Sequence, residues 1–207
     1  MSEKEKLQQL ASQIQACKCD QPYYYVSYST RDGESVYQDV LALQQAGKNL
    51  WIDVDVNFNT GEGYNSTIFN RLADTNCLGI LFFMSAQSMT SAQSTKEVAF
   101  ATSHRVLDGR GEALPICVVA LEDIEFGDIE KWVEGSLYSR YREEKLSALE
   151  AERIEKYRHK YNNKVNQAVT KFDLSECILK VLKTQEKAFV PMQDGAEKRV
   201  EKILSSL

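Results

Sequence analysis

Two uninterrupted apolar runs, LGILFFM at 78–84 and LPICVVAL at 114–121, constrain the fold of this chain more than any other feature. Strands without polar alternation are typical of parallel sheets that helices cover on both faces. Clusters of aromatic and β-branched residues predict two further strands, at 23–29 (YYYVSYS) and at 49–55 (NLWIDVD). We therefore expect at least four strands in a parallel arrangement.

Helical segments are predicted between these strands. A first helix is predicted from the helical spacing of Val36, Val40 and Leu43, and a second from that of Ile68 and Leu72. A third helix is expected over 91–106. Gly47 is the expected C-terminal cap of the first of these helices. The first 121 residues thus alternate strand and helix, which predicts right-handed crossovers in a doubly wound α/β sheet. We assume the common strand order 2-1-3-4-5, although no fifth strand is evident from the pattern.

Three regions are expected along the chain. Residues 1–21 form an N-terminal helical extension that Pro22 ends, and 22–135 form the core domain. Residues 136–207 are expected to be helical and to pack on the core or extend it. Within this last region, helices are predicted at 174–184 and 195–207.

Composition excludes several classes of function. The net charge of −5 argues against a nucleic-acid-binding surface, and no apolar run is long enough to span a bilayer. The charged start MSEKEKLQQL has no apolar secretory region, so a cytoplasmic protein is expected. The five scattered cysteines then remain reduced, and Cys17 and Cys19 lack the usual zinc spacing, so no metal site is expected.

In an open α/β sheet a ligand binds beyond the carboxyl ends of the strands, where the strand order reverses. For the assumed order this place lies between Ser27–Asp32 and Ser85–Glu97. The second segment is rich in serine and leads to Glu97 on the predicted third helix. One interpretation is a carboxylate held at the edge of a ligand site. The alternative is that the serines cap helices and that Glu97 merely offsets a helix dipole.

Three motifs follow one another within residues 22–121. The first is Val26-Ser27-Tyr28-Ser29 with Asp32, the second is Trp51-Ile52-Asp53 followed by a loop at about Val54–Asn65, and the third is the Ser85-x-x-Ser88 run that leads to Glu97. Together these motifs resemble a TIR domain, the family that calls the second-strand loop the BB loop. Two features depart from the family: Thr60-Gly61-Glu62-Gly63 replaces a Pro-Gly pair, and Gln93 and Ser94 stand where some NAD+-cleaving members carry a tryptophan.

The resemblance implies a flavodoxin-like sheet and one of two activities. Some TIR domains cleave NAD+, with a catalytic glutamate at the position of Glu97, and release nicotinamide with ADP-ribose or a cyclic or conjugated relative. This branch includes bacterial antiphage systems. It implies an NAD+ nucleosidase with NAD+ as substrate, no resident cofactor, and self-assembly with other TIR domains. The alternative is a non-catalytic TIR–TIR interaction module or an effector that mimics host adaptors.

Further candidates for substrate binding lie at the same strand ends: Tyr28, Ser29, Arg31, Asp53, Ser85 and Ser88. Tyr28 and Ser29 are expected to contact the ribose or the nicotinamide, and Arg31 either meets the pyrophosphate or is a solvated turn residue. Asp53 either positions the following loop or accepts hydrogen bonds in a turn. Ser85 and Ser88 either bond the nicotinamide or bond their own backbone.

Overall fold

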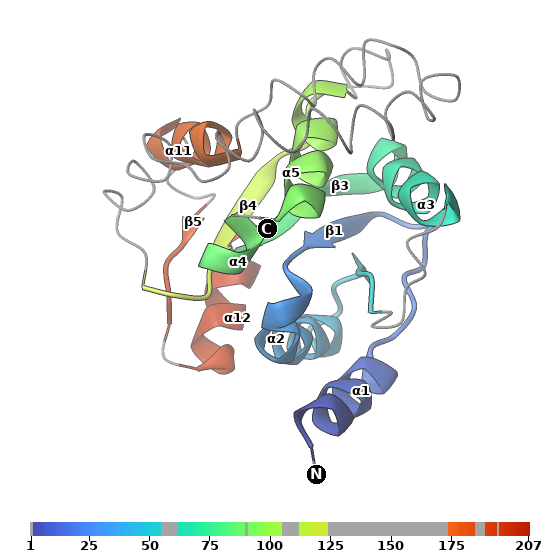
Figure 1. The fold of residues 1–207 in the computed structure, drawn as a ribbon, viewed down its shortest axis with the longest axis vertical. Helices are drawn as coiled ribbons and strands as arrows, with labels where there is room; N and C mark the ends of the chain where they lie inside the picture. The colour runs from blue at the N-terminus through green and yellow to red at the C-terminus, as the bar shows by residue number, and fades with distance from the viewer. Residues whose placement is uncertain are drawn as a thin grey trace.

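A parallel five-stranded sheet with helices on both faces forms the centre of the molecule (Figure 1). The computed structural model describes residues 2–54, 62–89, 91–104, 112–123, 174–184, 189–193 and 195–207. The strand order is β2-β1-β3-β4-β5, and every pair of neighbours is parallel. The flavodoxin-like α/β fold and the assumed order 2-1-3-4-5 are therefore confirmed.

Four of the five strands occur where the sequence patterns predicted them; β1, β2 and β4 are shorter than predicted, and β3 begins one residue earlier. Their bounds are β1 (Tyr23–Ser27), β2 (Leu50–Trp51), β3 (Cys77–Met84), β4 (Ile116–Ala120) and β5 (Phe189–Val190). The central strand β3 pairs with β1 on one side and β4 on the other, and seven of its eight residues are buried. This double burial explains why β3 has no polar alternation.

The fifth strand lies far along the chain from the other four. Phe189 and Val190 pair with Val118 and Val119 of β4. Two residues are too few to produce a periodic pattern, so β5 exists because β4 offers it a partner. The helices α11 (Leu174–Thr184) and α12 (Ala196–Ser206) flank β5 and confirm the two predicted C-terminal helices. The expected domain boundary at 135/136 lies outside the described residues.

The helices divide into two layers (Figure 1). One face of the sheet carries α3 (Glu62–Ala73), α11 and α5 (Ala92–Ala99), which a π-helical turn, η2 (Phe100–His104), continues. The other face carries α12 and α2 (Gly33–Gln45), and α1 (Glu3–Gln13) packs against α2. Because side chains alternate along β1, Tyr23 and Tyr25 pack in the core on the α3 and α5 face, and Val26 packs in the core on the α2 and α12 face. Among the described residues, no helix has the length and apolar character that crossing a membrane requires.

Two helix ends test the sequence predictions. Gly47, which follows the C-cap residue Ala46 of α2, has a φ of +84°, and the amide of Lys48 donates to the carbonyl of Leu43 at 3.0 Å, so the predicted glycine at this helix end is confirmed. The N-terminal helix is shorter than predicted, because α1 ends at Gln13 and Ile14 is extended. After α1, side chains rather than helical backbone groups bond the backbone. The side chain of Asn49, for example, accepts from the amide of Lys18 and donates to its carbonyl.

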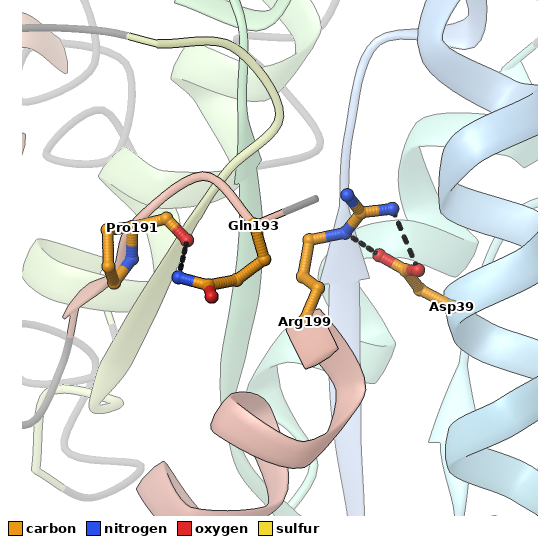
Figure 2. Close-up of polar contacts among 4 residues, drawn as sticks. All are labelled: Asp39, Pro191, Gln193 and Arg199. Carbon is orange, nitrogen blue, oxygen red and sulfur yellow. Dashed lines mark hydrogen bonds and ion pairs between the residues drawn. The ribbon is translucent and has the colours of Figure 1, made fainter. Parts of the chain in front are cut away.

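A buried ion pair fixes the C-terminal helix to the rest of the fold. Arg199 of α12 donates from Nε to Oδ2 of Asp39 at 2.5 Å and from Nη2 to Oδ1 at 2.9 Å (Figure 2). Asp39, on α2, is fully buried, and Arg199 is nearly so. Burial raises the pKa of Asp39, and the guanidinium of Arg199 opposes this shift. The two-point geometry keeps both charges paired in a place that water does not reach.

Candidate functional site

The serine-rich segment after β3 forms two short helices whose ends its own side chains cap. The amide of Ser85 donates to Oγ of Ser88 at 2.8 Å, and the amide of Ser88 donates to Oγ of Ser85 at 3.0 Å. This reciprocal pair begins α4 (Ala86–Met89). Ser91 then caps α5 by accepting from the amide of Ser94 at 3.2 Å. Of the four serines at 85, 88, 91 and 94, the first three therefore act as caps. This agrees with the alternative that the serines of this segment cap helices.

The carboxylate of Glu97 lies against the carboxyl end of β1. The hydroxyl of Ser27, the last residue of β1, donates to Oε2 of Glu97 at 2.6 Å. The side-chain amide of Gln93, one turn earlier on α5, donates to Oε1 at 3.1 Å. Glu97 is only 5% exposed, and no ion pair involves it within the described part of the chain. The predicted proximity of Glu97 to the end of the first strand is thus present in the fold.

Burial dominates the electrostatics of this carboxyl group. The pKa of Glu97 is raised to about 7, chiefly by desolvation and to a smaller extent by the charge of Asp53. Hydrogen bonds from Ser27, Gln93 and Tyr25 oppose the rise because they stabilise the ionised form. At neutral pH the group therefore exists in both protonation states. A carboxyl group tuned in this way, at the ligand-binding edge of an α/β sheet, is a candidate functional group.

An aromatic pair lies next to this carboxyl group. Tyr25 of β1 stacks on Trp51 of β2, with ring centroids 4.8 Å apart and planes inclined by 19°. Tyr25 is buried and Trp51 is half-buried. Because the side chain of Tyr25 also hydrogen-bonds Glu97, the stack with Trp51 restricts the position from which that bond is made.

Three predicted residues form a second polar cluster at the same edge of the sheet. Oγ of Ser85 donates to Oδ2 of Asp32 at 2.6 Å, which joins the end of β3 to the start of α2. Nη1 of Arg31 donates to Oε1 of Gln87 on α4 at 2.9 Å, and Ser29 accepts from the amide of Arg31 at 3.4 Å. Burial raises the pKa of Asp32, the charge of Glu122 adds to the rise, and the bond from Ser85 opposes it.

Tyr28 and Asp53 are brought together, and neither is among the residues that hydrogen-bond Glu97. The hydroxyl of Tyr28 donates to the backbone carbonyl of Asp53 at 2.5 Å and lies 2.9 Å from the hydroxyl of Tyr37 on α2. Tyr28 packs with the core on the α2 face, whereas Ser27 bonds Glu97 on the α5 face. Tyr28 directly follows β1, and its placement continues the alternation in which adjacent strand residues point to opposite faces. The carboxylate of Asp53 influences Glu97 only through its charge.

Three residues that contact Glu97 were not among the predicted site residues: Ser27, Gln93 and Tyr25. The signals for them were present in the sequence. Ser27 is the polar residue that shares a face of β1 with Tyr23 and Tyr25, and Gln93 precedes Glu97 by one helical turn. The sequence pattern does not show which face of β1 the predicted third helix, α5, covers.

No group of three or more His, Cys, Asp or Glu side chains within the described ranges is arranged to hold a metal ion. The candidate site consists of Glu97 with its partners Ser27, Gln93 and Tyr25, and of the neighbouring cluster around Asp32 and Ser85. Comparison with protein-family models, with curated proteins and with solved structures found no match to this chain.

Proposed function

We propose that this chain is a TIR-type NAD+ nucleosidase that cleaves the bond between nicotinamide and ribose, with Glu97 as its catalytic carboxylate. The observation that carries the proposal is the buried Glu97 side chain, which receives hydrogen bonds from Ser27 and Gln93 at the carboxyl end of β1. The motif resemblance at residues 22–121 and the strand order 2-1-3-4-5 support the same assignment. Because some TIR domains that cleave NAD+ belong to bacterial antiphage systems, we also propose that this chain acts in the cytoplasm in bacterial antiphage immunity.

The chemistry requires one carboxylate and no general acid. When the C1′–N bond of NAD+ breaks, its electron pair goes to the pyridinium nitrogen, so nicotinamide leaves as a neutral molecule. The ribose carbon becomes oxocarbenium-like, and an ionised carboxylate nearby stabilises that charge. Water then adds to the ribose carbon and loses a proton, which gives ADP-ribose. If a nucleophile of the adenine replaces this water, the product is cyclic.

The hydrogen-bond donors around Glu97 suit this role. Ser27 and Gln93 orient the two carboxylate oxygens and favour the ionised form, while burial keeps water away from the charge. An ionised group in a dry, fixed setting stabilises a developing positive charge more strongly than it would in water.

The burial of Glu97 also suggests how activity is controlled. At 5% exposure the carboxylate reaches a ribose only after neighbouring groups move. We propose that assembly with further copies of the TIR domain stabilises the open arrangement. Specific activity should then rise with protein concentration, because association favours the state that the partner binds.

The direct test is to incubate the full chain with NAD+ over a range of protein concentrations and to measure nicotinamide and ADP-ribose species by chromatography and mass spectrometry. Glu97→Gln keeps the size of the side chain and removes its charge. We expect this variant to lose at least about two to three orders of magnitude in rate, as is typical when a group that stabilises the transition state is removed.

Two controls make the test decisive. Circular dichroism of Glu97→Gln must show an unchanged fold, and molecular crowding must be included so that a dilute monomer is not mistaken for an inactive protein. Equal rates for the wild type and Glu97→Gln, or no cleavage at any concentration, would falsify the enzymatic proposal. The chain would then be assigned as a non-catalytic TIR–TIR interaction module.

A further inference from the structure

Ser94 differs from every other buried polar group of the described chain. Its side chain is fully buried, yet its Oγ has no hydrogen-bond partner among the described residues, and it is the one buried side-chain nitrogen or oxygen there of which this is true. The hydroxyls of two other residues in this part of the chain are satisfied. Thr95, the next residue, donates to the carbonyl of Ser91 at 2.9 Å, and Thr102 donates to the carbonyl of Val98 at 2.8 Å. Ser94 makes no such bond to its own helix.

Ser94 lies on the same helix as the candidate catalytic group. It precedes Glu97 by three residues on α5, so the two side chains lie on neighbouring positions of one helix face. Glu97 is directed at Ser27, at the carboxyl end of β1. Ser94 lies one turn nearer the N-terminus of α5, and this terminus is at the same edge of the sheet. Ser94 is fully buried and Glu97 is 5% exposed, so a ligand would reach either side chain only after neighbouring groups move.

An unsatisfied buried hydroxyl is unfavourable for the folded chain. Alanine at this position would remove the unpaired group and has a higher helix propensity than serine. In native proteins the exceptions to hydrogen-bond satisfaction call for an explanation, such as a functional role or a bound molecule. A group that finds its partner only in a ligand is such an explanation.

We propose that the hydroxyl of Ser94 contacts the substrate and hydrogen-bonds the nicotinamide-ribose half of NAD+ next to the group that Glu97 stabilises. A hydroxyl both donates and accepts, so it suits a sugar hydroxyl or a carboxamide. Ser94 takes no part in bond breaking; its contribution is binding and orientation. This inference rests on the proposed NAD+ nucleosidase activity and adds a second contact residue on α5.

The test compares Ser94→Ala with a matched control, Thr95→Val. Thr95 is adjacent and equally buried, but its hydroxyl is satisfied within α5. For Ser94→Ala we expect kcat/KM for NAD+ to fall about three- to tenfold, which is the effect of one lost hydrogen bond. We also expect the Tm of the ligand-free protein to rise by about 2–4 °C, because the unpaired group is removed. Thr95→Val should lower the Tm and leave kcat/KM within about twofold.

The expected rise in Tm for Ser94→Ala and the expected fall in Tm for Thr95→Val distinguish a substrate contact from a structural contact. A lower Tm for Ser94→Ala would overturn the inference, since the hydroxyl would then have a partner in the ligand-free chain. An unchanged Tm with an unchanged kcat/KM would also overturn it and indicate a buried water molecule as the partner. If the wild type cleaves NAD+ and Ser94→Ala does so equally well, only the inference about Ser94 fails. If the wild type neither binds nor cleaves NAD+, the proposed function fails, and the inference fails with it.

Discussion

The hydroxyl of Ser27 donates a hydrogen bond to the carboxylate of Glu97 across 70 residues of sequence, at 2.6 Å. This bond joins the carboxyl end of β1 to α5, one of the helices that cover that face of the sheet. It holds a nearly buried acid at the edge where α/β folds of this kind bind ligands. The pKa of that acid, raised by burial to about 7, leads to several measurable consequences.

The first prediction concerns the pH dependence of NAD+ cleavage. If only the ionised form of Glu97 is active, kcat/KM should rise about tenfold per pH unit at low pH and level off above a midpoint near pH 7, because the pKa of Glu97 is about 7. The midpoint for kcat should lie lower, because the bound pyridinium cation favours the ionised carboxylate. Initial rates between pH 5.5 and 8.5 measure both. A flat profile would show that ionisation of Glu97 is not required.

A second prediction is that Glu97 destabilises the fold at high pH. A carboxyl group whose pKa rises from 4.5 to about 7 on folding holds its proton more tightly in the folded chain, so the stability it contributes is complete below pH 4.5 and is lost as the pH rises through 7. The loss is on the order of 3 kcal/mol. Glu97→Gln cannot ionise and should escape it.

Urea unfolding of the wild type and of Glu97→Gln at pH 5 and at pH 8 tests this second prediction. The variant should be the more stable protein at pH 8, and the difference should narrow at pH 5. Other acids with raised pKa values, such as Asp32 and Asp39, are common to both proteins and cancel in the comparison. A difference that does not vary with pH would contradict the raised pKa.

The third prediction separates the two donors to Glu97. Ser27→Ala removes the bond that lowers the pKa of Glu97 most, so the midpoint of the pH–rate profile should move upward by about one unit, the effect of one charge-assisted hydrogen bond. Gln93→Ala should move it in the same direction by less. Thr102→Val is the control, since its hydroxyl bonds the carbonyl of Val98 and does not contact Glu97. A larger shift for Gln93→Ala than for Ser27→Ala would reverse the assigned order of the two donors.

The fourth prediction concerns the ion pair between Asp39 and Arg199. Arg199→Met leaves a buried carboxylate without its partner and should lower the free energy of unfolding by about 3–5 kcal/mol. The double variant Asp39→Leu/Arg199→Met removes both charges and should recover most of this loss. Chemical denaturation at pH 7 measures all three proteins. Lys6→Ala, which breaks the exposed pair with Glu34, should cost less than about 1 kcal/mol.

A fifth prediction assigns the capping serines to stability. Ser88→Ala removes the hydroxyl that accepts from the amide of Ser85 and should destabilise the protein by about 1 kcal/mol. Because both sides of this pair are satisfied within the chain, kcat/KM of the folded variant should stay within about threefold of the wild type. A loss of activity that exceeds the loss of stability would instead favour a direct contact between Ser88 and the substrate.

Much of the fold was predictable from local patterns. The apolar runs of β3 and β4 and the helical spacing of Val36, Val40 and Leu43 each lie within one segment, and burial of a whole strand or of one helix face makes such patterns visible. The strand β5 was not predictable, because its two residues are defined only by pairing with β4. The end of α1 at Gln13 was also missed, since distant side chains replace the helical bonds after it.

The alternation of strands and helices, and the acid Glu97 after a serine-rich turn, can be read directly from the sequence. Which residues contact that acid depends on how the strands and helices pack together. Ser27 and Tyr28 are neighbours in the chain, yet one bonds Glu97 and the other bonds the carbonyl of Asp53 on the opposite face. Adjacent side chains of a strand point to opposite faces, and Tyr28, directly after the last residue of β1, continues this alternation. The packing of distant helices then determines what each face contacts.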